Sequence, residues 1–485
     1  MADYDLVIRG GTVVTAAETT TCDVGIANGK IVALGSSLSP SAREIDASGR
    51  LVLPGGVDSH CQIHQPPVAN GSVNADTFET ATRSAAAGGT TTVISFSSQS
   101  KGSTLTENLR AYHEKARNSF IDYSFHLIVT DPSDAVLKEL PPLIAEGHRS
   151  LKVFMTYGGS VLNDAEVLRV LAMARKHGAL ITVHAENHEA IMFLTQALLE
   201  SGLSEMKYHA WAKPMVVERE ATHRVIALAE LLDQPIQVFH VSGAESAEEI
   251  HRAQQRGLKV LAETCTQYLV LTAADLDRPG FEGAKFLCSP APRTRDDQEA
   301  LWGYIRTGAL GVVSSDHSPF SFDDPKGKKL RGDAAPFSVV PNGVPGLATR
   351  LPILFSEGVI KGRIDLQTFV SVTATNPARL FGISPQKGSF ATTAADIAIW
   401  DPEKRVTITN DILHHAVDYT IYEGMQVQGW PITTLSRGEV VCEDGEIKGR
   451  PGHGRFLARE PYAFIKPRGR FVTPFNPVDR TIEAD

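Results

Sequence analysis

The chain has 485 residues, of which 42% are hydrophobic, and its formal net charge at pH 7 is −9. A chain of this length can bury a large core and can hold one large domain together with a smaller one. The negative charge and the scattered Lys and Arg residues argue against a nucleic-acid-binding protein. One short basic run, KGKK at 326–329, is expected to be a solvated loop.

Five cysteines are widely spaced and form no CxxC pair, and no secretory apolar segment stands near the start. We therefore expect a reducing, cytoplasmic compartment. No apolar run reaches the roughly 18 to 20 residues that a membrane helix needs, so we expect a soluble protein that does not bind a membrane.

The first part of the chain consists of short β-rich runs separated by GG, NG and SG turns. This pattern predicts a small antiparallel β unit over residues 1–53. Short β-rich runs return over residues 386–455, for example in ADIAIWDP and EVVCEDGEIKG. Since an isolated unit of three or four strands is marginally stable, we expect both chain ends to pair into one β-sandwich. The tail at 456–485 is expected to wrap a neighbouring subunit or to stay mobile.

Residues 54–385 alternate apolar runs with amphipathic helical segments, several of which end at glycine. Val, Ile and Leu dominate eight runs, which is typical of parallel strands that are covered on both faces. The runs are LVLPGGVDSH, TTTVISFSS, FHLIVT, SLKVFMT, LITVHAE, IQVFHVS, KVLAETC and LGVVSSDH. They predict an α/β fold with a (β/α)8 TIM-like barrel, and the alternative is an open doubly wound sheet.

Five polar residues stand at the C-terminal ends of separate runs, where barrels of this kind carry their catalytic groups. They are His60, Lys152, His184, His240 and Asp316. Imidazoles and carboxylates are the usual side-chain ligands of zinc-like metals. A single strand-end histidine is more often a hydrogen-bonded core residue, but three histidines with an aspartate favour a metal site. The sequence therefore predicts a metallohydrolase.

Lys152 has the apolar neighbours Leu151, Val153, Phe154 and Met155. Burial lowers the pKa of a lysine, and the resulting neutral amine can react with carbon dioxide to form a carbamate. Such a carboxylated Lys152 would be an anionic oxygen ligand able to bridge two metal ions. The alternative is a lysine in an internal ion pair.

Asp316 and Tyr157 are the candidate catalytic residues. A metal ion lowers the pKa of a bound water to about 7 and so supplies hydroxide at neutral pH. Asp316 could then bind metal and accept the proton as general base. Tyr157 follows the run that holds Lys152 and could donate its hydroxyl to a developing oxyanion. The structural alternatives are a helix cap for Asp316 and a rim aromatic for Tyr157.

Several motifs resemble those of the cyclic amidohydrolases, and within them those of the dihydropyrimidinase and hydantoinase group. The motifs are PGGVDSH, SLKVFMTY, VHAEN, FHVS, LCSPAPR, SSDHSP and PNGVPG, with ADIAIWDP near the C-terminus. The resemblance implies a hydrolase that opens the amide bond of a cyclic ureide or imide, such as a hydantoin or dihydropyrimidine ring. It also implies a homotetramer.

The same resemblance assigns roles to the site residues. One divalent metal, expected to be zinc, would be held by carboxylated Lys152 with His184 and His240, and a second by Lys152 with His60 and Asp316. Tyr157 would stabilise the tetrahedral intermediate. Backbone groups at Ser289 and Asn342 would hold the ureide or imide edge of the substrate.

The chain departs from the family at the first barrel strand, where the family has His-X-His and this sequence has His60-Cys61-Gln62. Gln62 is a candidate metal ligand, but a glutamine carbonyl binds zinc more weakly than imidazole does. The sequence is therefore compatible with either one or two bound metal ions. His64 lies about 6.6 Å further along an extended strand and cannot replace the missing histidine, but it could face the substrate.

Two other functions remain open at this stage. One is a non-catalytic scaffold, because relatives of this fold have lost their metal ligands and act through assembly. The other is a mononuclear barrel hydrolase of a different substrate class, such as a deaminase. The retention of Lys152, His184, His240 and Asp316 argues against the scaffold, because a scaffold has no need of a buried lysine.

Overall fold

The computed structural model describes residues 4–391 and 394–482. Its centre is a sheet of eight parallel strands that follow one another in chain order. They are β6 (Gly56–Asp58), β7 (Thr90–Ser98), β8 (Asp122–Ile128), β9 (Ser150–Phe154), β10 (Leu180–His184), β11 (Ile236–Val238), β12 (Val260–Cys265) and β13 (Val312–Ser314). Cys61 pairs with His317 just beyond β6 and β13, which brings the first strand back beside the last. The predicted (β/α)8 barrel is confirmed.

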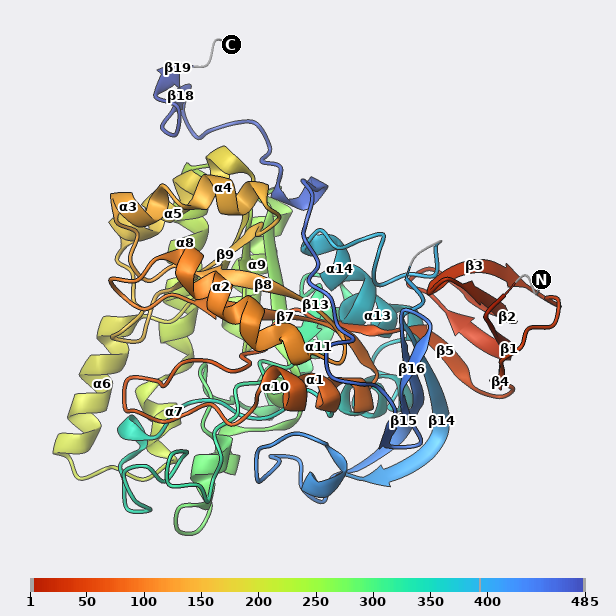
Figure 1. The fold of residues 1–485 in the computed structure, drawn as a ribbon. Helices are drawn as coiled ribbons and strands as arrows, with labels where there is room; N and C mark the ends of the chain where they lie inside the picture. The colour runs from red at the N-terminus through yellow and green to blue at the C-terminus, as the bar shows by residue number, and fades with distance from the viewer. Residues whose placement is uncertain (1–3, 392–393, 483–485) are drawn as a thin grey trace.

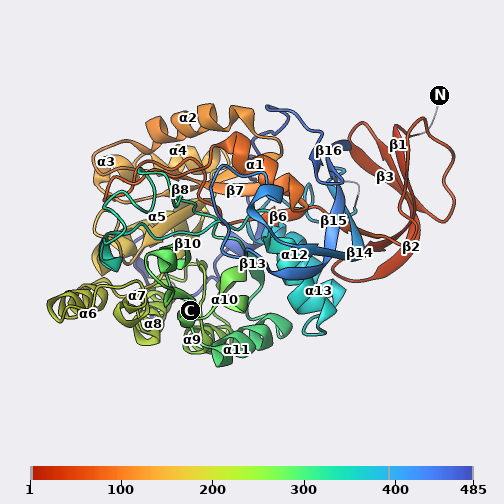
Figure 2. The same ribbon diagram turned by 90° about the horizontal axis from the view of Figure 1, so that it is seen from below.

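Helices surround these strands, as Figure 2 shows for α2, α5, α8, α9 and α11. The longer ones are α1 (Phe78–Ala87), α2 (Leu105–Lys115), α5 (Asp164–His177), α6 (His188–Glu200), α8 (Met215–Leu231), α9 (Ala244–Gln255) and α11 (Arg295–Arg306). Shorter ones are α3 (Asp134–Leu137), α4 (Leu140–Ala145), α7 (Tyr208–Ala212), α10 (Thr266–Val270), α12 (Arg350–Leu354), α13 (Leu366–Val370) and α14 (Asn376–Leu380). Every residue of β8 and β10 is buried, because helices cover the outer face of the barrel and side chains fill its interior.

Helix α5 illustrates how local sequence sets these boundaries. Asn163 and Glu166 form a reciprocal capping box that satisfies free amides at the start of the helix. Gly178 follows its last residue with φ of 76°, a left-handed conformation that glycine adopts without steric cost. Val167, Val170, Leu171 and Ala174 recur at helical spacing and are buried.

A second sheet lies beside the barrel and contains strands from both chain ends (Figure 1). Its order is β17-β16-β15-β14-β5-β1-β2-β3, with β4 beside β1. The N-terminal strands are β1 (Leu6–Val14), β2 (Thr19–Ala27), β3 (Lys30–Gly35), β4 (Glu44–Asp46) and β5 (Leu51–Pro54). The C-terminal strands are β14 (Ile397–Thr407), β15 (Gln426–Ser436), β16 (Glu439–Glu443) and β17 (Glu446–Ile447). The antiparallel pair β5–β14 joins the ends, as expected.

Two details of this sheet differ from the sequence prediction. The run LVLPGGVDSH is divided, because LVLP forms β5 of the second sheet and GVD forms β6 of the barrel. The N-terminal unit is also not purely antiparallel, since β1 pairs in parallel with both β4 and β5. A parallel pair needs a long crossover, and residues 15–50 supply it.

The C-terminal tail packs in its first part against the barrel of its own chain, and its contact with a neighbouring subunit stays a prediction. Phe456 pairs with Tyr123. The buried guanidinium of Arg459 donates from Nη1 to Ser150 Oγ at 2.7 Å and from Nε to the Gly147 carbonyl at 3.1 Å. The small hairpin of β18 (Phe475–Asn476) and β19 (Thr481–Ile482) then extends away from the body of the molecule (Figure 1).

The basic run at 326–329 is likewise not a solvated loop throughout. Lys328 is buried, because backbone carbonyls take the place of water around its ammonium group. Within residues 4–391 and 394–482, no helix combines the length and the apolar character needed to cross a bilayer.

Candidate metal centre

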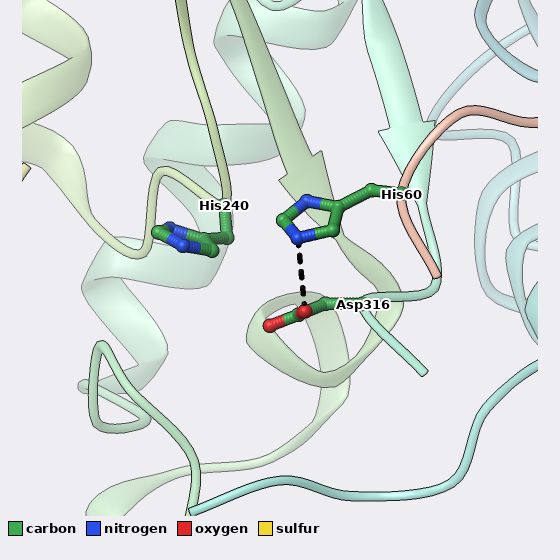
Figure 3. A group of neighbouring side chains, drawn as sticks. All are labelled: His60, His240 and Asp316. Atoms are coloured by element: carbon green, nitrogen blue, oxygen red, sulfur yellow. Dashed lines mark ion pairs between the residues drawn. The ribbon is translucent and has the colours of Figure 1, made fainter. Parts of the chain in front are cut away.

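Three of the predicted ligands converge at the C-terminal ends of the barrel strands. The ligand atoms of His60, His240 and Asp316 all lie within 4.8 Å of one another, and the three residues are buried. Figure 3 shows His60 Nε2 facing Asp316 Oδ1, at 3.1 Å, with the His240 ring beside them. His240 and Asp316 have φ values of 42° and 45°. Residues other than glycine take this conformation at an energetic cost, which is typical of functional positions.

His60 is oriented by a buried glutamate on β12. Its Nδ1 lies in a short contact with Glu263 Oε1, so Nε2 is the nitrogen left for Asp316 or a metal ion. Burial works to lower the pKa of His60, but the charges of Asp316 and Glu263 outweigh it and raise that pKa to about 9. Two carboxylates thus make the site attractive to a cation.

Lys152 lies on β9 with its side chain fully inside the barrel. The amine is 4.1 Å from the centroid of the Phe239 ring, and Nζ has no hydrogen-bond partner among the described residues. Burial lowers the pKa of Lys152 to about 7, although Asp316 and Glu263 act in the opposite direction. Burial thus favours the neutral amine, the state that reacts with carbon dioxide.

His184, at the end of β10, packs its ring 4.4 Å from the His240 ring, measured between centroids. Its Nε2 lies 2.7 Å from Glu186 Oε2. His240 Nδ1 has no partner within the described chain. His184 thus contacts the cluster only by packing against His240. Its ligand atoms are not among those of the three residues that converge most closely.

The donor set fits a divalent metal ion. Imidazole nitrogen and carboxylate oxygen are borderline to hard donors of the kind that zinc and related ions bind. Buried polar groups are normally hydrogen-bonded, so the unpaired Lys152 Nζ and His240 Nδ1 need a partner that the protein itself does not supply. A bound metal ion would supply such a partner to His240 Nδ1.

Gln62 occupies the position where the related motif has its second histidine. Its Nε2 donates to Asp316 Oδ1 at 3.3 Å. A half-turn about the last side-chain bond would instead present the amide carbonyl to the cluster. Gln62 is therefore within reach of a metal bound at Asp316, as a neutral and weaker ligand than imidazole.

Tyr157 lies beside the cluster on the loop after β9. Its ring is 5.1 Å from the His184 ring, and its φ of 69° is left-handed. Burial and the nearby Glu186 raise the pKa of Tyr157, while the hydroxyl of Ser289 acts in the opposite direction. The phenol therefore stays protonated at neutral pH and can donate a hydrogen bond.

Ser289 and Asn342 have unused backbone groups. Within the described chain, neither residue's N–H or C=O takes part in a hydrogen bond, and the buried Asn342 Oδ1 has no partner. Backbone N–H and C=O groups are strong hydrogen-bonding groups, so these unpaired ones are suited to a ligand. His64 lies apart from them: its N–H donates to Asn74 Oδ1 at 3.1 Å, and its carbonyl accepts from Lys115 Nζ at 2.9 Å. Among the described residues, no hydrogen bond or ion pair joins His64 to the cluster, and its role stays a prediction.

Comparison with known proteins decides the family. A family model described as "Amidohydrolase family" matches residues 51–441. A D-hydantoinase of Rhizobium radiobacter is 45% identical over 461 residues, which cover 94% of this chain and 99% of that protein. The chain belongs to the amidohydrolase family.

Further comparisons place this amidohydrolase in the hydantoinase group. A D-hydantoinase of Streptomyces coelicolor is 44% identical over 468 residues, covering 95% of this chain and 99% of that protein. The solved structure of a dihydropyrimidinase from Brevibacillus agri NCHU1002 matches with a TM-score of 0.91 and 44% identity, covering 94% of this chain and 99% of that one. The resemblance drawn from the sequence motifs is confirmed.

The sequence interpretation missed three charged residues of this amidohydrolase. Glu263 holds His60, and Glu186 accepts from His184 Nε2 and, at 3.5 Å, from Lys213 Nζ. Glu263 stands within an apolar barrel strand, KVLAETC, as Lys152 does in SLKVFMT, so the same signal was available for both. Glu186 and Lys213 lie in loops, where sequence alone does not show burial.

Replacing Glu263 with glutamine is expected to lower the metal affinity by about 10- to 100-fold, because His60 loses the charged acceptor that fixes its ring and tautomer. Metal retained after dialysis against graded chelator concentrations measures the change. The matched control is Glu403→Gln on the exposed part of β14, which should bind metal as the unsubstituted protein does. An unchanged affinity in Glu263→Gln would show that Glu263 does not support the centre.

Proposed function

We propose that this amidohydrolase opens the ring of a cyclic ureide or imide by hydrolysing one of its amide bonds. The observation that carries the proposal is the convergence of His60, His240 and Asp316 beside the buried, unpaired Lys152. Relatives over nearly the whole chain are D-hydantoinases, which supports a hydantoin or dihydropyrimidine-like ring as the substrate.

The metal ligands would be His60, His184, His240, Asp316 and Lys152 in its N6-carboxylated form, with Gln62 as a further oxygen donor. We propose zinc as the resident metal, because these donors match its preference. A bound divalent ion would lower the pKa of a water molecule and polarise the scissile carbonyl. The carbamate on Lys152 would remove the energetic cost of the buried amine, because its oxygens would have cationic partners.

Asp316 would accept the proton of the attacking water. The charge of His60 holds the pKa of Asp316 below the usual value although burial acts to raise it, and a bound metal ion would likewise favour the ionised carboxylate, which can act as a base. Tyr157, whose phenol stays protonated, would donate a hydrogen bond to the oxygen that becomes negatively charged as the carbonyl is attacked. The proton held by Asp316 then passes to the departing ring nitrogen.

Ser289 and Asn342 would hold the ring. Their unpaired backbone N–H and C=O groups can bond the alternating donors and acceptors of a ureide or imide edge. This edge is common to hydantoins, dihydropyrimidines and cyclic imides, so these contacts would select the class of substrate. Selectivity for the ring substituent would depend on the surrounding loops.

Ring opening of a small panel tests the proposal. Hydantoin, a 5-substituted hydantoin in both enantiomers, dihydrouracil and succinimide are incubated with metal-reconstituted protein, and the ring-opened products are followed by NMR. We expect turnover of at least one ring and preference for the D enantiomer, as in the D-hydantoinase relatives. Metal-loaded protein that opens none of these rings would overturn the proposal in favour of a scaffold or of a deaminase.

Gln62→His is expected to tighten the second metal site. We propose that the native chain holds one metal ion tightly and a second one weakly, because a neutral amide replaces imidazole beside Asp316. Restoring imidazole should raise the affinity of the weaker site by about 10- to 100-fold. Isothermal titration of the apoprotein with zinc measures both affinities. Two equally tight sites in the native chain would contradict this assignment, and Gln65→His, three residues further along the chain, is the control.

We also propose that the chain forms a homotetramer, with α6 in an interface. Two large apolar residues of α6 are exposed, Met192 by 52% and Phe193 by 74%, and nearby Trp211 is 60% exposed. Figure 1 shows α6 at the edge of the molecule. Exposed apolar surface of this kind is typical of protein contacts.

Phe193→Glu should reduce the mass of the assembly from four chains to two or one, because it places a charge in the proposed contact. Size-exclusion chromatography with light scattering measures the mass, and Val32→Glu on β3 is the control at an exposed apolar residue far along the chain. A tetramer that persists in Phe193→Glu would exclude α6 from the interface.

We propose a cytoplasmic location for the protein. All five cysteines are free and buried, which is compatible with a reducing compartment. Fractionation of cells that express the tagged protein tests this directly.

A further inference from the structure

Lys328 is a second buried lysine, and it lies outside the metal centre. Its side chain is among the largest that are fully buried, and Nζ donates to the Pro341 carbonyl at 2.9 Å and the Gly343 carbonyl at 2.8 Å. A longer contact of 3.5 Å reaches the Leu287 carbonyl. Within the described residues Lys328 forms no ion pair with a carboxylate. Three carbonyls therefore occupy the three donor positions of the ammonium group.

The backbone before Lys328 directs its side chain inward. The Lys328 N–H donates to the Ser321 carbonyl at 2.8 Å, which closes a compact loop. A Cβ on Gly327 would lie 1.9 Å from that same carbonyl oxygen, so only glycine fits there. The burial of Lys328 is thus built into the loop, and a buried charge is costly unless its partners are well arranged.

The three carbonyls belong to the two segments that carry the unpaired backbone groups. Pro341 and Gly343 flank Asn342, and Leu287 precedes Ser289 by two residues. The two segments also touch directly, because the Gly343 N–H donates to the Leu287 carbonyl at 2.9 Å. Lys328 therefore ties together the segments on both sides of the proposed ring site.

The hydrogen bond from Lys328 to the Pro341 carbonyl also fixes the direction of the Asn342 N–H. The Pro341 carbonyl and the Asn342 N–H belong to one planar trans peptide group and point in opposite directions. When Lys328 holds the carbonyl oxygen, the Asn342 N–H must point away from Lys328 and toward the side that lacks a protein partner. A loose Pro341–Asn342 peptide would let this N–H rotate and lose its fixed direction.

We propose that Lys328 is a positioning residue that sets the orientation of Asn342 relative to Ser289 and thereby the affinity for the ring edge. The inference rests on the proposed function, because it assigns a determinant of substrate binding at the same site. Within the part of the chain that the structure describes, Lys328 Nζ forms no hydrogen bond with a candidate metal ligand. Its loss should therefore weaken ring binding and leave the metal content and the chemical step in place.

Lys328→Met tests this, because methionine has a similar length and no donor. We expect KM for the best ring of the panel to rise about tenfold or more while kcat changes less than about threefold, the signature of lost binding. Metal content should be unchanged, and amide hydrogen exchange should accelerate in 287–289 and 341–343. Lys329→Met is the control, since Lys329 is partly exposed and pairs with Asp323 at 2.7 Å.

The outcomes separate the two proposals. Suppose that the native protein is active and that Lys328→Met has the same KM, even with a lower Tm. Lys328 would then be a packing residue, and the inference would be overturned while the proposed function stands. A native protein that opens no ring overturns both. If Lys328→Met does not fold, Lys328→Gln, which keeps one donor group, is judged by the same KM-against-kcat comparison and by hydrogen exchange.

Discussion

Asp316→Asn is expected to lower kcat by about 10³- to 10⁴-fold with little change in KM, because an amide cannot accept the proton of the attacking water. Asparagine has nearly the shape of aspartate, so the hydrogen bond from Gln62 and the left-handed backbone at this position can be retained. Steady-state kinetics at saturating zinc measures the effect, so that any weaker metal binding does not limit the rate.

Asp323→Asn makes the same chemical change on an exposed loop, where the carboxylate is 76% exposed and pairs with Lys329. It should leave kcat within about twofold, since surface ion pairs contribute little. If Asp316→Asn keeps more than a tenth of the native kcat at saturating metal, Asp316 is not the general base and another group must accept the proton.

Lys152→Ala is expected to remove most of the bound metal and to lower kcat/KM by about 10³-fold or more, because the carbamate would be lost as a ligand and with it the activated water. The side chain leaves a space beside the Phe239 ring. A small carboxylate such as acetate or propionate can enter this space and supply two oxygens in place of the carbamate. Partial recovery of metal binding and activity with added carboxylate is therefore the specific expectation.

Metal analysis and kinetics with and without added carboxylate measure the rescue. Lys138→Ala on the exposed end of α3 is the control, and it should match the native protein in both metal content and rate. Full metal content and full activity in Lys152→Ala would show that Lys152 is not a ligand. Loss of activity without any rescue, together with retained metal, would assign it a role in packing alone.

The fold was largely predictable from the sequence, because each barrel strand is a mostly apolar run. Such runs are typical of strands that are buried on both faces. The division of LVLPGGVDSH between two sheets was not predictable, since the run is continuous in sequence and only tertiary pairing with β14 and β7 separates its two parts. The parallel pairing of β1 with β4 and β5 was hidden for a similar reason, because strand direction depends on the path of residues 15–50.

The candidate site was predictable where polar residues end apolar strands, as His60, His240 and Asp316 do. It was less predictable in the loops that complete it. Lys328 sits in a basic run whose composition is typical of a solvated surface, and only the turn at Gly327 and the three carbonyls explain its burial. The left-handed backbone at Tyr157, His240 and Asp316 likewise has no sequence signal, because no glycine marks these positions and the conformation is uncommon for other residues.

Titration of the metal-free protein with zinc, in the presence of bicarbonate and a cyclic ureide, tests whether a metal ion at this centre opens the ring. We expect no ring opening without metal, activity that rises with added zinc and reaches a plateau at one to two equivalents per chain, and a slower rise when carbon dioxide and bicarbonate are excluded. Ring opening that is equally fast in rigorously metal-free protein, or a metal-saturated chain that opens no cyclic amide, would contradict this expectation.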